Sequence, residues 1–145
     1  TMKMHVIVLL ALFTVSAGSV ARDDKNLYPI EAAMNTSGAK EKLNKGYTFK
    51  FGDASHAEIA ENHGSFTSNK KTNAFNKSDQ EACEWAFLSA MVSFQDRITQ
   101  EGGNAVVNIR SYYKKNELSS ETEYECGNGA IMAGVTFKGD VVTLK

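Results

Sequence analysis

The sequence predicts an α+β fold in which one long helix packs on a mainly antiparallel sheet. One unbroken helical pattern runs from Ser78 to Glu101, and segments of alternating apolar and polar residues lie on both sides of it. Strands and helices do not alternate along the chain, as they would in a parallel sheet. A short N-terminal helical region and one disulfide complete this expectation.

The first 21 residues have the three parts of a secretory signal peptide. Lys3 supplies a basic start, Val6 to Val15 form an apolar run, and Ala21 closes a cleavage-site pattern. A retained membrane anchor is the alternative, but the run is shorter than the roughly 20 apolar residues that a span needs. We therefore expect export into an oxidising compartment, the bacterial periplasm. No cysteine follows the run, so we expect no lipid anchor.

The remainder has the length of one domain. Residues 22–46 form an N-terminal leader with short helices: a polar, mobile stretch to Tyr28, a helix from Pro29 to Met34 and a further turn or two from Ala39 to Leu43. Residues 47–145 form the single α+β domain. Strands are expected at 47–51 and 57–66, with a bulge or close approach at Gly64.

The long helix has a clear start and a clear end. Ser78 and Glu81 match a capping box, and Gly102–Gly103 suit a left-handed C-terminal cap. Its apolar residues form two faces rather than one. The first face, which we expect to pack on the sheet, contains Cys83, Phe87, Ala90, Met91, Phe94 and Ile98. The second contains Trp85, Leu88 and Val92, and either the N-terminal helical region or a partner covers it.

Further strands are expected after the helix, at 104–113, 121–126, 130–137 and 141–144. Between them we expect a polar connection at 114–120, a turn or bulge at 127–129 and a turn at 139–140. Simple alternation in the first of these strands places two sets of side chains on opposite faces: Ala105, Val107 and Ile109 on one, and Val106, Asn108, Arg110 and Tyr112 on the other.

Cys83 and Cys126 are the two cysteines of the chain. An even number of cysteines in an exported protein favours a disulfide. A catalytic or metal-binding thiol pair is the alternative, but the spacing is not C-x-x-C and no histidine lies beside either residue.

Charge and glycine spacing argue against nucleic-acid and nucleotide binding. Without Lys3 the chain has 15 basic and 17 acidic residues, so it lacks the basic surface that nucleic acid requires. Gly129 and Gly134 have the spacing of a P-loop, but Val135–Thr136 replace the Lys–Ser/Thr pair and no helix pattern follows. We expect no nucleotide and no other cofactor.

The remaining polar residues form no clear catalytic or metal-binding set. His56 and His63 would lie on opposite faces of a regular strand, so surface or turn positions are the simpler interpretation. Glu121, Glu123 and Glu125 share one strand face and would serve a hydrolase only in a cleft. An ion-pair surface that includes Lys114, Lys115 and Arg110 is the simpler expectation.

The helix that carries Cys83, followed by Gly103-Asn104-Ala105-Val106-Val107, resembles the RcsF and YbjQ-like group of small bacterial envelope domains. The resemblance covers residues 57 to 144 and implies an α+β fold with a Cys83–Cys126 bridge. The lipidated cysteine and second disulfide of the RcsF-type sensor have no counterpart here. The whole chain also resembles exported proteins labelled "excinuclease ATPase subunit", but it lacks the Walker motif and zinc-finger cysteines that this label requires.

These observations lead to one functional hypothesis and one alternative. The hypothesis is a non-enzymatic periplasmic module that binds other envelope proteins, as an accessory subunit of an envelope or secretion-type assembly or as a homo-oligomer. Its candidate contact residues are Trp85, Leu88 and Val92, and then Tyr112 and Tyr113. The alternative is a periplasmic domain that binds a small ligand or a metal, with His56, His63 and carboxylates as the available metal ligands.

Overall fold

The computed structural model describes residues 22–145, so the predicted signal peptide lies outside the described residues. The described part is an α+β fold with a seven-stranded mixed sheet and one long helix. Its elements in chain order are β1 (Asp23–Pro29), α1 (Ile30–Met34), α2 (Ser37–Lys42), β2 (Thr48–Phe51), β3 (Ile59–Asn73), α3 (Asp79–Glu101), β4 (Ala105–Tyr113), β5 (Asn116–Leu118), β6 (Glu123–Gly129) and β7 (Met132–Leu144).

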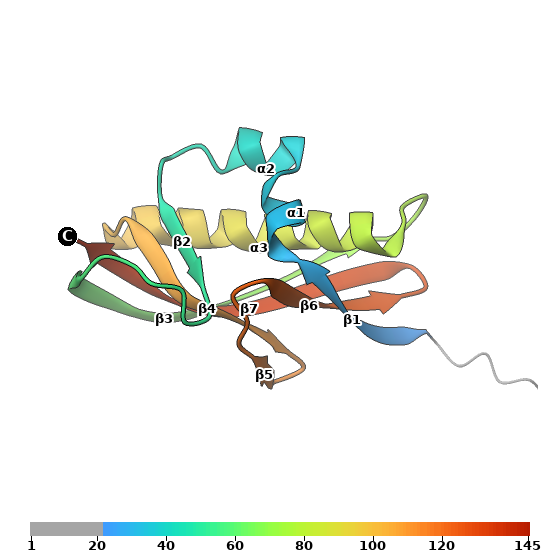
Figure 1. Cartoon of the computed structure of the whole chain (residues 1–145). Coiled ribbons are helices and arrows are strands. Elements are labelled where there is room, and N and C mark those ends of the chain that lie inside the picture. The colour runs from blue at the N-terminus through green and yellow to red at the C-terminus, as the bar shows by residue number, and fades with distance from the viewer. Residues whose placement is uncertain (1–21) are drawn as a thin grey trace, which may run out of the picture.

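The sheet is built around β7. The main strand order is β1-β6-β7-β4-β2, with β3 paired to the other edge of β7 and β5 paired to β4. All pairings are antiparallel except the parallel one between β2 and β4. α3 lies along one face of the sheet, α2 lies on the outer side of α3, and α1 connects β1 to α2 (Figure 1). The predicted fold class is confirmed.

α3 has the predicted ends and the predicted buried face. The Ser78 hydroxyl accepts a hydrogen bond from the Glu81 backbone N–H, and Gly102 closes the helix in the left-handed conformation. The first apolar face is buried along its whole length. Its Phe87 ring lies 4.8 Å from the Tyr124 ring of β6 and 5.6 Å from the Phe137 ring of β7.

The predicted disulfide joins Cys83 to Cys126, with their Cα atoms 6.0 Å apart. The bond connects the first turns of α3 to the middle of β6. Asn128, two residues further along β6, is also buried and donates a hydrogen bond to the Asp79 carbonyl. The N-terminal half of α3 is therefore held to the sheet by covalent and polar contacts as well as by apolar packing.

The prediction of a mobile leader at 22–28 is wrong. Residues Asp23–Pro29 form β1, which pairs with β6 along its length. Asn26 donates to the Asn128 side chain at 2.8 Å, and Arg22 binds Asp79 at the start of α3. Backbone pairing and these polar contacts hold the strand in place. Its sequence therefore lacks the alternating apolar residues by which a strand is recognised, and sequence reasoning missed it.

Two glycine segments predicted as turns lie inside strands. β7 runs unbroken through Gly139, where a Cβ would lie 2.5 Å from the Val106 side chain, so glycine serves a close approach of strands. The segment 127–129 belongs to β6, and a Cβ on Gly127 would meet the Tyr113 ring. In both places the absent side chain makes room for a neighbour rather than for a turn.

β4 departs from simple alternation. A register shift between Val107 and Arg110, with Asn108 at φ +52°, places Ile109 on the helix-facing side with Val106. Ala105 and Val107 instead pack with Val142 in a small separate cluster. The prediction that grouped Ile109 with Ala105 and Val107 is therefore wrong, because the bulge reverses the side-chain alternation. The expected polar connection after β4 contains β5, which closes a hairpin at Lys114–Lys115.

One detail of β3 agrees with prediction, and the end of the strand does not. The register shift between Asn62 and Gly64, where the glycine has φ +111°, is the expected bulge. The strand extends further than expected, to Asn73, and its basic residues Lys70 and Lys71 lie on a strand that pairs only with β7 within the described residues. None of the helices within residues 22–145 combines the length and hydropathy of a membrane span.

Candidate functional site

The candidate site is a groove along the outer face of α3, between α2 and β3. It consists of two adjoining cavities that share Trp85 and Leu88. The inner cavity has a volume of about 180 Å³, and the outer cavity has about 360 Å³. The inner cavity is lined by Thr36, Ser37, Gly38, Glu81, Glu84, Trp85 and Leu88, and the outer cavity by Lys42, Lys70, Trp85, Leu88, Ser89, Val92, Ser93 and Asp96.

The second apolar face of α3 forms the floor of this groove and is only partly covered. Leu88 is 3% exposed, and a Cβ on Gly38 of α2 would lie 3.0 Å from its side chain. α2 is held there because Gln95 donates a hydrogen bond to the Lys42 carbonyl at 2.9 Å. Trp85 remains 42% exposed, and Val92 is half-buried. The N-terminal helical region thus covers Leu88 and leaves the indole accessible.

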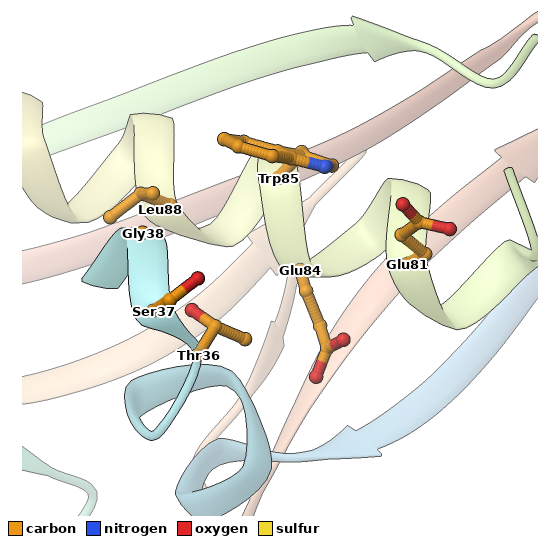
Figure 2. Close-up of a pocket in the computed structure, with 7 residues that line it drawn as sticks. All are labelled: Thr36, Ser37, Gly38, Glu81, Glu84, Trp85 and Leu88. Atoms are coloured by element: carbon orange, nitrogen blue, oxygen red, sulfur yellow. The ribbon is translucent and has the colours of Figure 1, made fainter. Parts of the chain in front are cut away.

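The inner cavity is acidic. Glu81 and Glu84 line it from α3, and the Glu84 side chain extends toward the segment that carries Thr36 and Ser37 (Figure 2). Burial raises the pKa of the Glu84 carboxyl, and the charge of Glu81 raises it further. Thr36 already donates to the Ala33 carbonyl and caps α2. Ser37 supplies the second hydroxyl.

The outer cavity has the opposite character. Lys42 from α2 and Lys70 from β3 line it, together with Asp96 and two serines of α3. The Lys42 Nζ atom lies 5.8 Å from the centre of the Trp85 ring. The exposed indole therefore stands between an acidic cavity and a largely basic one.

Tyr112 and Tyr113, the second pair of predicted contact residues, do not lie in this groove. They belong to the β4–β5 hairpin, which projects from the side of the sheet opposite α3 (Figure 1). The Lys138 Nζ atom lies 4.0 Å from the centre of the Tyr112 ring, and the Tyr113 ring covers Gly127. Both tyrosines are half-buried by these contacts, and Trp85 is the more accessible aromatic residue.

The histidines and the glutamate series do not form a site. His56 lies exposed in a loop, whereas His63 packs on β7 and hydrogen-bonds the Thr143 hydroxyl at 2.9 Å, so His63 differs from the predicted surface or turn position. No group of three or more histidine, cysteine or carboxylate side chains within residues 22–145 is arranged to hold a metal ion.

The expected ion pairs form with different carboxylates. Arg110 pairs with Glu117, and Lys114 pairs with Asp23, rather than with Glu121, Glu123 or Glu125. The reason is the β4–β5 hairpin, which places Glu117 opposite Tyr112 and beside Arg110, while β1 brings Asp23 to Lys114. The prediction of an ion-pair surface around the glutamate series is wrong in its partners.

Sequence reasoning found the floor of the groove but missed its walls. Glu81 precedes Trp85 by four residues and Glu84 precedes Leu88 by four, so helical spacing alone could have placed both carboxylates beside the second apolar face. Gly38, Lys42 and Lys70 come from other elements, and no local pattern connects them to α3.

No protein-family model matches the chain, and no curated protein matches it. What the groove does is therefore inferred from its own residues.

Proposed function

We propose that the protein is a non-enzymatic interaction module of the bacterial periplasm that binds another envelope protein through the groove around Trp85. The observation that carries this proposal is the 42% exposure of Trp85 on the floor of a groove in which Leu88 is buried and Val92 is half-buried. Tryptophan is the residue most enriched at binding hot spots, where its large ring fills a partner's pocket or closes over a partner's side chain.

The dimensions of the groove favour a polypeptide segment. It runs along α3 from Glu81 to Asp96, which is about 22 Å at the helical rise per residue. An extended segment of about six or seven residues covers that length. Such a segment would also lie close to β3, which contributes Lys70 to the wall of the outer cavity.

The rigidity of the groove supports binding. The Cys83–Cys126 bond anchors α3 two residues before Trp85, and the Gln95–Lys42 hydrogen bond fixes α2 on the opposite wall. A preformed surface spends less of its interaction free energy on ordering side chains. The disulfide is also consistent with the oxidising compartment that the predicted signal peptide implies.

A capture experiment with two variants tests the proposal. The full chain with a C-terminal tag is expressed in a Gram-negative host, cross-linked in intact cells and purified, and the attached proteins are identified by mass spectrometry. Trp85→Ala is expected to lose specific envelope proteins that the unmodified chain retains. Phe75→Ala is the matched control, because Phe75 is 78% exposed but does not line the groove.

Circular dichroism verifies that both variants fold. The proposal is contradicted if Trp85→Ala and Phe75→Ala recover the same proteins as the unmodified chain. If the chain is recovered cross-linked only to itself, and Trp85→Ala abolishes this cross-link, the partner is a second copy of this chain and not another envelope protein.

A further inference from the structure

The inner cavity contains two carboxylates and no cation to balance them. Neither the Glu81 nor the Glu84 side chain forms an ion pair within residues 22–145. The Arg22 guanidinium is already engaged by Asp24 and Asp79. Lys42 reaches the Trp85 ring from the outer cavity and does not line the inner one.

Glu81 has a structural reason for its position, but Glu84 has none. Glu81 is in the first turn of α3, where an acidic side chain favours the helix dipole. Glu84 lies beyond that turn, is half-buried, and faces the repulsion of Glu81 without a compensating partner. The buried Tyr124 hydroxyl also lacks a hydrogen-bond partner among residues 22–145, and the charge of Glu84 adds to the rise in the pKa of that hydroxyl.

The size of the cavity limits what it can hold. Its volume of about 180 Å³ lies below the range of about 300–1,000 Å³ that is usual for small-molecule sites. A single long side chain is small enough to enter it. Trp85 and Leu88 also line the outer cavity, where neighbouring residues of the same segment would continue.

We propose that the inner cavity binds one arginine or lysine side chain of the partner protein. This inference rests on the proposed function and specifies the chemistry of the partner. The cationic group lies between Glu81 and Glu84, while the alkyl stem packs against the exposed face of Trp85. Charge-assisted hydrogen bonds compensate the desolvation of Glu84, and the Ser37 hydroxyl accepts a further N–H of the ligand.

Trp85 makes the test direct because it is the only tryptophan of the chain, so intrinsic fluorescence reports from the wall of the cavity. The oxidised chain is titrated at constant ionic strength with Nα-acetyl-arginine amide and Nα-acetyl-lysine amide. The neutral isostere Nα-acetyl-citrulline amide is the ligand control. Single residues bind weakly, so the titrations extend to about 50 mM.

We expect a saturable change in fluorescence with at least one cationic probe, and binding of the citrulline probe that is about tenfold weaker or more. Glu84→Gln should weaken binding of the cationic probe by about tenfold, since a hydrogen bond to a charged group is lost. Glu101→Gln is the matched control. It removes the same charge from the same helix, but Glu101 lines neither cavity, so the affinity of this variant should stay within about twofold of the unmodified chain.

Three results would overturn the inference: no saturable response, equal affinity for the citrulline probe, or equal weakening by Glu84→Gln and Glu101→Gln. These results are separable from a failure of the proposed function. If Trp85→Ala loses its captured proteins while Glu84→Gln retains them and the cationic probes do not bind, the groove is an interface that does not recognise a basic side chain.

Discussion

The clearest quantitative prediction concerns Gly139 in the middle of β7. Although Gly139 lies in a strand, it packs where β7 passes between α3 and β4. A Cβ at this position would lie 2.5 Å from the Val106 Cγ1 atom, 3.3 Å from the Ile109 Cγ1 atom and 3.4 Å from the Phe94 ring. A contact of 2.5 Å is shorter than real Cβ atoms make, so Gly139→Ala forces the buried Val106 side chain to move.

The magnitude follows from two opposing effects. Adding a methyl group to a packed core costs about 1–3 kcal/mol. Replacing glycine by alanine at an ordinary backbone conformation recovers about 0.4–1 kcal/mol through the unfolded chain. The expected net loss in the free energy of unfolding is about 1–2 kcal/mol, and this lowers the Tm by roughly 4–8 °C for a domain of this size.

Urea unfolding followed by circular dichroism measures this loss, and two further variants separate packing from propensity. Gly134→Ala is the control in the same strand, because its Cβ would make only ordinary contacts of 3.5 Å and more, and stability should not fall. Val106→Ala vacates the nearest methyl group, so adding Gly139→Ala to it should cost less than about 0.5 kcal/mol. An equal loss for Gly134→Ala and Gly139→Ala, or full additivity with Val106→Ala, would refute the steric argument.

Three other predictions follow from the cap, the disulfide and the buried tyrosine. Ser78→Ala removes the acceptor of the Glu81 N–H and should cost about 1 kcal/mol in urea unfolding, whereas Ser78→Asp should retain most of the stability. Reduction of the Cys83–Cys126 bond, whose residues are 43 apart, should lower the free energy of unfolding by about 4 kcal/mol; an unchanged midpoint with dithiothreitol would contradict this. Burial raises the pKa of Tyr124 far above its usual range, so its contribution to stability is complete below the unfolded pKa of about 10 and is lost as the pH rises beyond it. Tyrosinate absorbance should therefore show one tyrosine that ionises only as the chain unfolds, and Tyr124→Phe should abolish that step.

The predictions that succeeded rest on signals carried by neighbouring residues. The limits of α3 follow from Ser78 and Gly102, which act on the backbone groups of their own helix turns. Its buried face follows from 3.6-residue spacing. The disulfide follows from the number of cysteines in a chain with an export pattern. Fold class follows from the order of such segments.

The predictions that failed depend on contacts between distant residues. β1 is a strand because β6, about 100 residues later, pairs with it, and its own sequence is polar. Gly139 lies in a strand because β7 pairs there with Phe66 of β3, whereas a glycine followed by an aspartate predicts a turn when only neighbours in the sequence are considered. The bulge at Asn108 reverses which residues of β4 face the helix.

The groove, too, was in part predictable from neighbouring residues and in part dependent on contacts between distant ones. Helical periodicity alone determined that α3 carries a second apolar face that includes Trp85, because that periodicity is a property of one continuous segment. Only the tertiary structure decided that α2 covers Leu88, that Trp85 stays exposed, and that Glu84 lines a small cavity without an ion-pair partner among residues 22–145. Exposure and the absence of a partner are properties of three-dimensional packing, set here by α2, α3 and β3 together.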